Sequence, residues 1–289
     1  MQCKLIVTDM DGTLLNSQDE ISKRTYDALI KAQEKGIKVI LASGRSWVTM
    51  KDFGEQLQIP RFDGYYVGAN GSAIMEAKTM ENTIVSQLQP DEIKEIFESA
   101  KEYEVEIMCV LDAGIYDYIP ASFRELKRQY RKEHNIADDV PWTGGTFLLV
   151  EDQRVGYPDI HDVQSFDEID FPVNKMTLCQ TTEVIEKAYQ GLSEKFKGKY
   201  VFAKTSDTWI EVTSQSVSKG NAVSLLQEKF DIKKEETLVF GDGENDLSMF
   251  ERGYAVAMGN AMNTVKAKAN EVTLDNNSNG IAVIVERFL

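Results

Sequence analysis

The segment "KLIVTDMDGTLL" at residues 4–15 joins an apolar run directly to two aspartates. A short apolar run without strict alternation, followed by Gly12, is typical of a strand buried on both faces. If the strand continues through them, Asp9 and Asp11 point to the same side, because side chains at i and i+2 share a face. A calcium loop is excluded, because Leu14 stands where it needs glycine. An ordinary turn and a binding site both remain open for this segment taken alone.

The sequence after this segment predicts a parallel sheet. Residues 23–36 have apolar spacings of three and four, with Ser22 as N-cap and a glycine at the end, and therefore predict a helix. Residues 37–43 predict a second buried strand, 46–58 a second helix, and 64–75 a third strand with a glycine-rich break. Alternating strands and helices of this kind favour a parallel sheet with right-handed crossovers.

The chain returns to this alternation after a different middle part. Residues 219–231 predict a helix, 236–242 a strand, and shorter helices and strands follow, with a last helix from about Asn279. In the middle, longer strands with alternating polarity indicate an antiparallel sheet with one covered face. We therefore predict an α/β fold, with a Rossmann-like core of residues 1–82 and 215–289, helices on both sheet faces, and an inserted α+β domain at 83–214. Its predicted strands are 105–111, 114–120, 146–152, 174–180 and 208–214, and its helices 90–104 and 182–196.

The composition excludes several classes of function. A net charge of −15 and a pI near 4.7 disfavour nucleic acid and anionic membranes as partners, since both require a basic surface. Cys3, Cys109 and Cys179 are odd in number and far apart, so no disulfide framework is expected. His134 and His161 are the only histidines, which disfavours histidine-based catalysis. Without a signal peptide or a long apolar run, we expect a cytoplasmic protein.

A second acidic cluster, "VFGDGENDLSMF", follows the predicted strand 236–242. Asp242 and Asp246 are four residues apart, and Asn245 lies between them. The carboxyl ends of parallel strands meet at one sheet edge, so Asp9 and Asp11 are expected there too. Like charges this close call for a cation. Oxygen ligands without histidine or cysteine point to Mg²⁺ rather than zinc.

The same edge offers groups that bind anions. Ser43 and Gly44 follow the second strand at the start of a helix, where a hydroxyl and backbone N–H groups attract phosphate, although a plain N-cap is the commoner meaning. Lys219 begins a helix, where its charge opposes the dipole and calls for an anion or carboxylate partner; a solvated surface lysine is the alternative. Together the carboxylates, hydroxyl and lysine indicate a phosphoryl site in which an aspartate can be the nucleophile.

Four motifs in this order resemble the haloacid dehalogenase superfamily: "DMDGTL" from Asp9, "SGR" from Ser43, "SKG" around Lys219 and "GDGEND" from Gly241. The chain is most similar to the Cof-type sugar-phosphatase branch, in which a large α+β cap is inserted between the second and third motifs. The segments "GANGSAI" from Gly68 and "WIEVTSQSVSKG" from Trp209 also resemble that branch. The resemblance covers nearly the whole chain.

The resemblance implies a role for each matching residue. Asp9 would be the nucleophile, and Asp11 the general acid and then the base that activates water. The resemblance further implies that Mg²⁺ is held by Asp9, the backbone carbonyl of Asp11 and Asp242, with Asp246 in support. The phosphate oxygens would be held by Ser43, the N–H of Gly44, Lys219, Asn245 and the N–H of Met10.

We accordingly expect a Mg²⁺-dependent phosphatase of small phosphorylated metabolites, with sugar phosphates as the first candidates. Two alternatives remain: a sugar phosphomutase, and a sensor that binds phosphorylated ligands without catalysis. Arg45 fits a phosphate contact or an ion pair about equally. The basic stretch at residues 124–132 fits a solvated helix face better than a phosphate site. The sequence names neither the substrate nor the oligomeric state.

Overall fold

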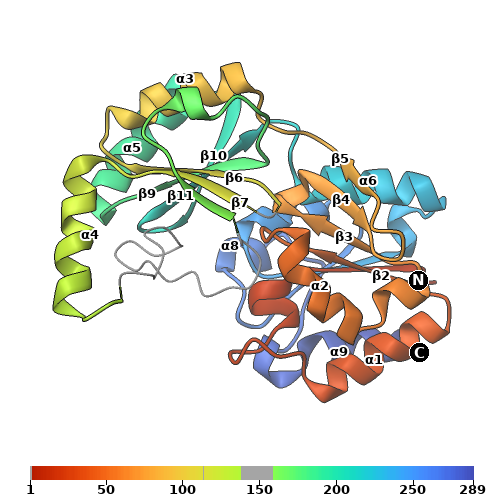
Figure 1. Ribbon diagram of the computed structural model, residues 1–289. Coiled ribbons are helices and arrows are strands. Elements are labelled where there is room, and N and C mark those ends of the chain that lie inside the picture. The colour runs from red at the N-terminus through yellow and green to blue at the C-terminus, as the bar shows by residue number, and fades with distance from the viewer. Residues whose placement is uncertain (1, 113, 138–158) are drawn as a thin grey trace. The chain divides into compact units, whose positions relative to one another are not determined.

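The computed structural model describes residues 2–112, 114–137 and 159–289. It forms two compact units. Unit 1 comprises Met1–Val85 and Ser216–Leu289, and unit 2 comprises Ser86–Gln215 (Figure 1). The predicted strand at 146–152 lies outside the described residues.

Unit 1 is built on an eight-stranded sheet in the order β14-β13-β12-β1-β2-β3-β4-β5. β1 (Leu5–Thr8) lies in the middle of the sheet and is buried along its whole length. It pairs in parallel with β2 (Lys38–Ala42) on one side and with β12 (Thr237–Gly241) on the other. Because these three strands run in the same direction, the segments that follow them emerge at one edge of the sheet, as predicted.

The outer strands include one departure from the prediction. β3 (Tyr65–Gly68) is parallel, but β4 (Ala73–Glu76) runs antiparallel to it, so residues 64–75 form a hairpin rather than one interrupted strand. The glycine-rich break is the turn itself. β5 (Asn82–Ile84) adds a second antiparallel strand at this end. The other end is formed by β13 (Tyr254–Ala257) and β14 (Glu271–Val272), both parallel.

Helices cover both faces of this sheet. Figure 1 shows α1 (Lys23–Glu34) and α9 (Gly280–Val285) together on one side of the strands and α6 (Lys219–Phe230) on the other. Ser22 accepts a hydrogen bond from the N–H of Thr25 and caps α1 as predicted. The predicted α/β core is therefore confirmed. The remaining helices of the unit are α2 (Trp47–Gln56), α7 (Leu247–Phe250) and α8 (Asn263–Lys266).

Unit 2 has a six-stranded, mostly antiparallel sheet in the order β10-β11-β9-β6-β7-β8. Apolar side chains on one face of it pack against α3 (Pro90–Lys101) and α5 (Thr182–Lys195). β10, which pairs with β11, was not predicted from the sequence. The strands are β6 (Glu106–Val110), β7 (Gly114–Tyr118), β8 (Asp159–Asp162), β9 (Lys175–Cys179), β10 (Tyr200–Ser206) and β11 (Trp209–Ser214).

The basic stretch at 124–132 lies on α4 (Ala121–Glu133), and the expected solvated face is wrong for part of it. Lys127 is only 1% exposed, and its Nζ lies 2.5 Å from Glu106 Oε2. Arg131 is also buried. Both residues share one helix face with Phe123, because they follow it at intervals of four. Lysine and arginine can bury their aliphatic stems along apolar surface, so the charge of a residue does not by itself place it in solvent.

Two expectations from composition can also be compared with the structure. Cys3, Cys109 and Cys179 are buried free thiols. Within the described part of the chain, no helix is both long enough and apolar enough to cross a membrane.

Candidate active site

The first acidic motif forms a wide turn at the end of β1. β1 ends at Thr8, and the N–H of Leu15 donates to the carbonyl oxygen of Met10, which closes the turn at Met10–Leu14. Asp9 is 6% exposed, whereas Asp11 lies in the turn and is exposed. Asp9 is therefore the buried carboxylate of the pair, and Asp11 is the solvent-exposed one.

Gly12 and Thr13 join this turn to the second acidic motif. Gly12 has φ +75°, and a Cβ there would lie 2.4 Å from Asp242 Oδ2, so only glycine fits. Thr13 Oγ1 donates a 2.7 Å hydrogen bond to Asp242 Oδ1. Sequence reasoning missed Thr13, although it belongs to the "DMDGTL" motif. Its hydroxyl orients Asp242 toward the turn that carries Asp9.

Asp246 holds the second acidic loop in place. Its Oδ2 accepts hydrogen bonds from the backbone N–H groups of Asp242 (2.9 Å) and Gly243 (3.0 Å). Its Oδ1 accepts a hydrogen bond from Lys219 Nζ at 2.6 Å. Both oxygens of Asp246 thus accept hydrogen bonds from the protein, which suits a role in holding Lys219 and the second acidic loop in place.

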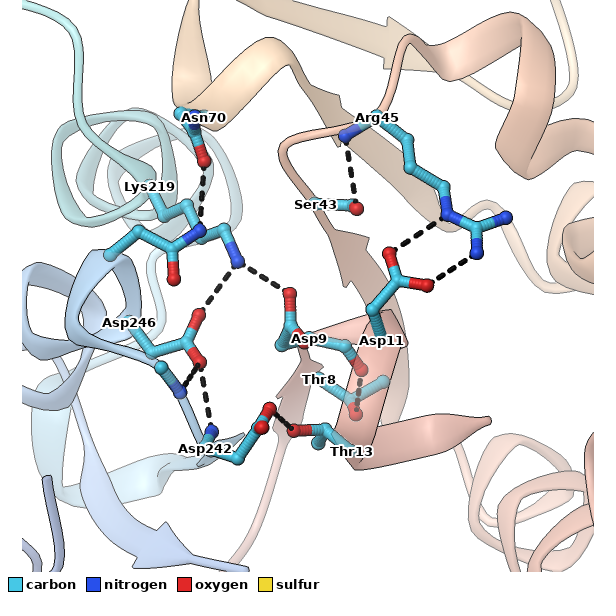
Figure 2. Close-up of polar contacts among 12 residues, drawn as sticks. Thr8, Asp9, Asp11, Thr13, Ser43, Arg45, Asn70, Lys219, Asp242 and Asp246 are labelled. Atoms are coloured by element: carbon cyan, nitrogen blue, oxygen red, sulfur yellow. Dashed lines mark hydrogen bonds and ion pairs between the residues drawn. The ribbon is translucent and has the colours of Figure 1, made fainter. Parts of the chain in front are cut away.

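Lys219 connects the two acidic motifs. It is the first residue of α6, which Ser218 caps, and its side chain is fully buried. Besides Asp246, its Nζ donates to Asp9 Oδ1 at 2.5 Å (Figure 2). The alternative of a solvated surface lysine is therefore excluded. Burial acts to lower the pKa of Lys219, but the two carboxylates outweigh it, and the net pKa is raised.

The buried charges of this cluster do not balance within the protein. Asp9, Asp242 and Asp246 each offer a carboxylate oxygen, and these atoms lie within 4.8 Å of one another. Burial, and then the charge of Asp246, raises the pKa of Asp9 well above its usual range. Burial likewise raises the pKa of Asp242 to about 6. When all three carboxylates are ionised, they leave two negative charges beside the one ammonium, so the donor set fits a divalent cation with a preference for oxygen ligands.

Arg45 forms an ion pair with Asp11. Its Nε donates to Asp11 Oδ2 at 2.8 Å, and a terminal nitrogen of the guanidinium donates to Oδ1 (Figure 2). Of the two meanings that the sequence left open for Arg45, the structure contains the ion pair, and the acid is Asp11 itself. A two-pronged contact of this kind fixes both the position and the orientation of the carboxylate.

Ser43 and Asn245 are the other side chains that the sequence predicts to hold phosphate oxygens. Ser43, at the end of β2, is 1% exposed, and its Oγ accepts a hydrogen bond from the N–H of Arg45. Asn245 is exposed, and its Nδ2 donates to Asn70 Oδ1 at 3.0 Å. Sequence reasoning missed Asn70 as a site residue. Its segment, "GANGSAI", was singled out only for its resemblance to the Cof-type branch.

Two predicted contacts involve the backbone. Gly44 lies against Asn70: a Cβ on Gly44 would be 3.2 Å from Asn70 Oδ1. The side chain of Met10 is buried in the core, which leaves only its backbone for a ligand. The structure thus brings Asp9, Lys219, Asp242 and Asp246 into direct or nearest-neighbour contact, with Ser43, Gly44 and Asn245 on adjoining loops, and the Asp11 carboxylate paired with Arg45 instead.

Comparison with known proteins identifies relatives of the chain. Residues 6–285 match the family of haloacid dehalogenase-like hydrolases. Phosphatase YwpJ of Bacillus subtilis is 30% identical over 294 residues, which covers 99% of this chain and 100% of the relative. A second B. subtilis relative, the 5-amino-6-(5-phospho-D-ribitylamino)uracil phosphatase YwtE, is 27% identical and covers 99% of this chain and 98% of its own.

Solved structures agree with these matches. A haloacid dehalogenase-like hydrolase from Bacteroides thetaiotaomicron has a TM-score of 0.78 and 28% identity, and covers 99% of this chain and 100% of its own. The sugar phosphatase BT4131, described as subclass IIB of the superfamily, has a TM-score of 0.74 and 25% identity, with 99% and 98% coverage. The predicted membership is confirmed: the chain belongs to the haloacid dehalogenase-like hydrolase family.

Proposed function

We propose that this hydrolase is a Mg²⁺-dependent phosphatase that releases phosphate from small phosphorylated metabolites, with sugar phosphates as its substrate class. Phosphatase activity follows from the family and from the relatives that are named as phosphatases. One observation carries the proposal of a Mg²⁺-dependent mechanism: Lys219 is buried between Asp9 and Asp246, with Asp242 beside them. The proposal includes the cytoplasmic location expected from the sequence.

The geometry of Asp9 suits nucleophilic attack. Lys219 binds Oδ1, and among the described residues none donates a hydrogen bond to Oδ2. The proposed first step forms a bond between an Asp9 oxygen and phosphorus, and breaks the bond from phosphorus to the alkoxide, which takes a proton from Asp11. In the second step Asp11 takes a proton from water. The resulting hydroxide attacks phosphorus, and phosphate leaves as the Asp9 carboxylate is restored.

The other residues stabilise charge during these steps. When bound, Mg²⁺ would neutralise charge on the phosphoryl oxygens, held by Asp9, the carbonyl of Asp11 and Asp242. Lys219 keeps a positive charge beside the attacking carboxylate, and Asp246 fixes its ammonium in place. Ser43, the N–H groups of Gly44 and Met10, and Asn245 are proposed to hold the phosphoryl oxygens. Preorganised donors of this kind reduce the cost of developing charge in the transition state.

Unit 2 is proposed as the domain that selects the substrate. Its bounds, Ser86–Gln215, lie close to the predicted insertion at 83–214. BT4131 is named a sugar phosphatase, and YwtE acts on a phosphate carried by a ribityl chain. Both names describe a phosphate on a polyhydroxylated carbon chain. These relatives support the proposal of sugar phosphates and related polyol phosphates for this chain.

A phosphate-release screen tests the proposal. Purified protein is incubated with hexose and pentose phosphates, ribityl phosphates, nucleotides and phosphorylated cofactors, with Mg²⁺ or after chelation. We expect release from sugar or polyol phosphates with Mg²⁺, and at least a ~100-fold loss after chelation, because the buried carboxylates then repel the substrate. Isomerised sugar phosphate without release would instead identify a phosphomutase. Binding without either product would identify a sensor.

Arg45→Gln is expected to lower kcat roughly 10-fold, less than the ~10²–10⁴-fold that general acid–base catalysis contributes as a whole. The guanidinium fork fixes the orientation of the Asp11 carboxylate, which is the group that accepts the proton from water. The second step should therefore slow more than the first. Rapid-quench experiments should show the aspartyl-phosphate accumulating in the variant.

Arg45→Lys serves as the companion variant, because lysine keeps the charge but loses the planar fork. It should recover only part of the rate. Stability should change little in both variants, since the Asp11 side chain is 53% exposed. Equal slowing of both steps would show that the ion pair has no special part in the proton transfer from water.

A further inference from the structure

The turn between β3 and β4 has an unusual backbone. Ala69, Asn70 and Gly71 all have positive φ, at +48°, +57° and +101°. Glycine adopts this region freely and asparagine tolerates it, but each residue of another type costs about 1–2 kcal/mol. Backbone strain of this kind persists only where the surroundings hold it in place. The contacts of the turn therefore show which neighbouring segments it holds in place.

Those contacts lead to three segments of the proposed phosphate site. The N–H groups of Ala69 and Asn70 donate to the carbonyl oxygens of Arg45 (2.8 Å) and Ser43 (2.9 Å), in the loop that follows β2. Gly71 packs so closely against the start of α6 that a Cβ on it would lie 2.2 Å from the Ser218 carbonyl oxygen. The turn thereby fixes the loop after β2 beside the helix that begins with Lys219.

The side chain of Asn70 makes the third connection. Its Oδ1 accepts the 3.0 Å hydrogen bond from Asn245 Nδ2. An amide nitrogen carries two N–H donors. With one directed at Asn70, the second is held in a defined direction and is available to a phosphoryl oxygen. Asn245 is exposed and lies in the short 3-10 helix Glu244–Asp246, so the acceptor on Asn70 determines how its amide is presented.

We propose that Asn70 is a positioning residue that acts through Asn245, orienting its amide for the phosphoryl group. This inference rests on the proposed phosphatase function and extends it by one residue. A neutral acceptor is required. Aspartate could accept the same hydrogen bond, but it would add a negative charge beside the phosphate.

Three variants separate the backbone of residue 70 from its side chain. Asn70→Gly keeps the left-handed backbone and removes Oδ1. Asn70→Asp keeps an acceptor and adds charge. Asn279→Gly is the matched control, because Asn279 also has a positive φ (+62°) and its Oδ1 also accepts a hydrogen bond, from Ser22. It contacts none of the proposed site residues in the described structure.

Binding of inorganic phosphate with Mg²⁺ is measured by calorimetry, and as product inhibition of ester hydrolysis. Asn70→Gly is expected to raise the dissociation constant of phosphate and the KM about 10-fold, which corresponds to one hydrogen bond to a charged group. Asn70→Asp should weaken phosphate binding further. Asn279→Gly should leave both constants unchanged, while its thermal unfolding reports the general cost of such a substitution.

A double-mutant cycle with Asn245→Ala decides whether Asn70 acts through Asn245. If it does, Asn70→Gly adds nothing to Asn245→Ala, and the two effects are strongly non-additive. Additive effects, or unchanged phosphate binding in Asn70→Gly, would overturn the proposal.

Failure of the positioning role of Asn70 can be distinguished from failure of the proposed function. Wild-type protein that binds phosphate but hydrolyses no ester refutes the phosphatase, and the binding cycle still decides the role of Asn70. Wild-type protein that does not bind phosphate refutes the positioning role as well.

Discussion

Asp9→Asn is expected to abolish phosphate release, with a loss of more than about 10³-fold, while the protein remains folded. The amide cannot form the aspartyl-phosphate, because it lacks the nucleophilic oxygen anion. The hydrogen bond from Lys219 can be retained, since an amide oxygen can still accept it. The loss therefore reports the chemical step, and it is measured as phosphate release under saturating Mg²⁺.

The effect of Asp9→Asn on stability has a definite sign. The pKa of Asp9 is raised in the folded state, chiefly by burial, so its ionisation opposes folding. The metal-free wild-type protein should lose stability as the pH rises above the unfolded pKa of an aspartate, near 4, until Asp9 ionises in the folded state as well. Asp9→Asn avoids the loss of stability that ionisation of Asp9 causes. Without metal at neutral pH, its unfolding temperature should equal or exceed that of the wild type.

Asp52→Asn is the matched control for this variant, because Asp52 is exposed on α2. It should keep full activity and stability. Normal phosphate release in Asp9→Asn would refute the aspartyl-phosphate mechanism. Loss of activity together with early unfolding would show that the fold depends on the Asp9 charge, contrary to the direction of its pKa.

The site residues at the sheet edge could be predicted from the sequence, because one simple rule places them there. Segments that follow parallel buried strands emerge together, so Asp9, Ser43 and Asp242 could be placed near one another from the strand pattern alone. Asp246 followed from its spacing to Asp242. These residues need no knowledge of side-chain direction, only of the order and direction of the strands.

The parts that could not be predicted depend on local backbone geometry. The sequence did not identify Asp11 as the acid that pairs with Arg45, because that contact depends on how the turn after β1 presents the Asp11 side chain. Asn70 was hidden in what looked like an interrupted strand, because its role arises from a left-handed turn. Lys127 looked solvated because its charge is visible in the sequence, whereas its burial depends on which face of α4 packs inward.

Lys219→Met is expected to remove both activity and stability. Methionine has similar length but no charge, so Asp9 and Asp246 would remain buried without their shared ammonium. Breaking a buried ion pair by removing one partner typically costs about 3–5 kcal/mol, because an uncompensated charge stays behind. We expect a comparable decrease in the free energy of unfolding, measured in denaturant without metal. Phosphate release should fall by more than about 10³-fold.

Two further variants and the metal make this prediction specific. Lys229→Met, at a 54% exposed lysine of the same helix, should change stability by less than about 0.5 kcal/mol. Adding Asp246→Asn to Lys219→Met should recover part of the lost stability, since one of the unpaired carboxylates is then neutral. Mg²⁺ should stabilise Lys219→Met more than the wild type, because a divalent cation would offset a larger excess of negative charge.

If Lys219→Met were as stable as the wild type and insensitive to Mg²⁺, the buried carboxylates would have to be protonated in the native protein. Asp9 could not then be the ionised nucleophile that the proposed mechanism requires.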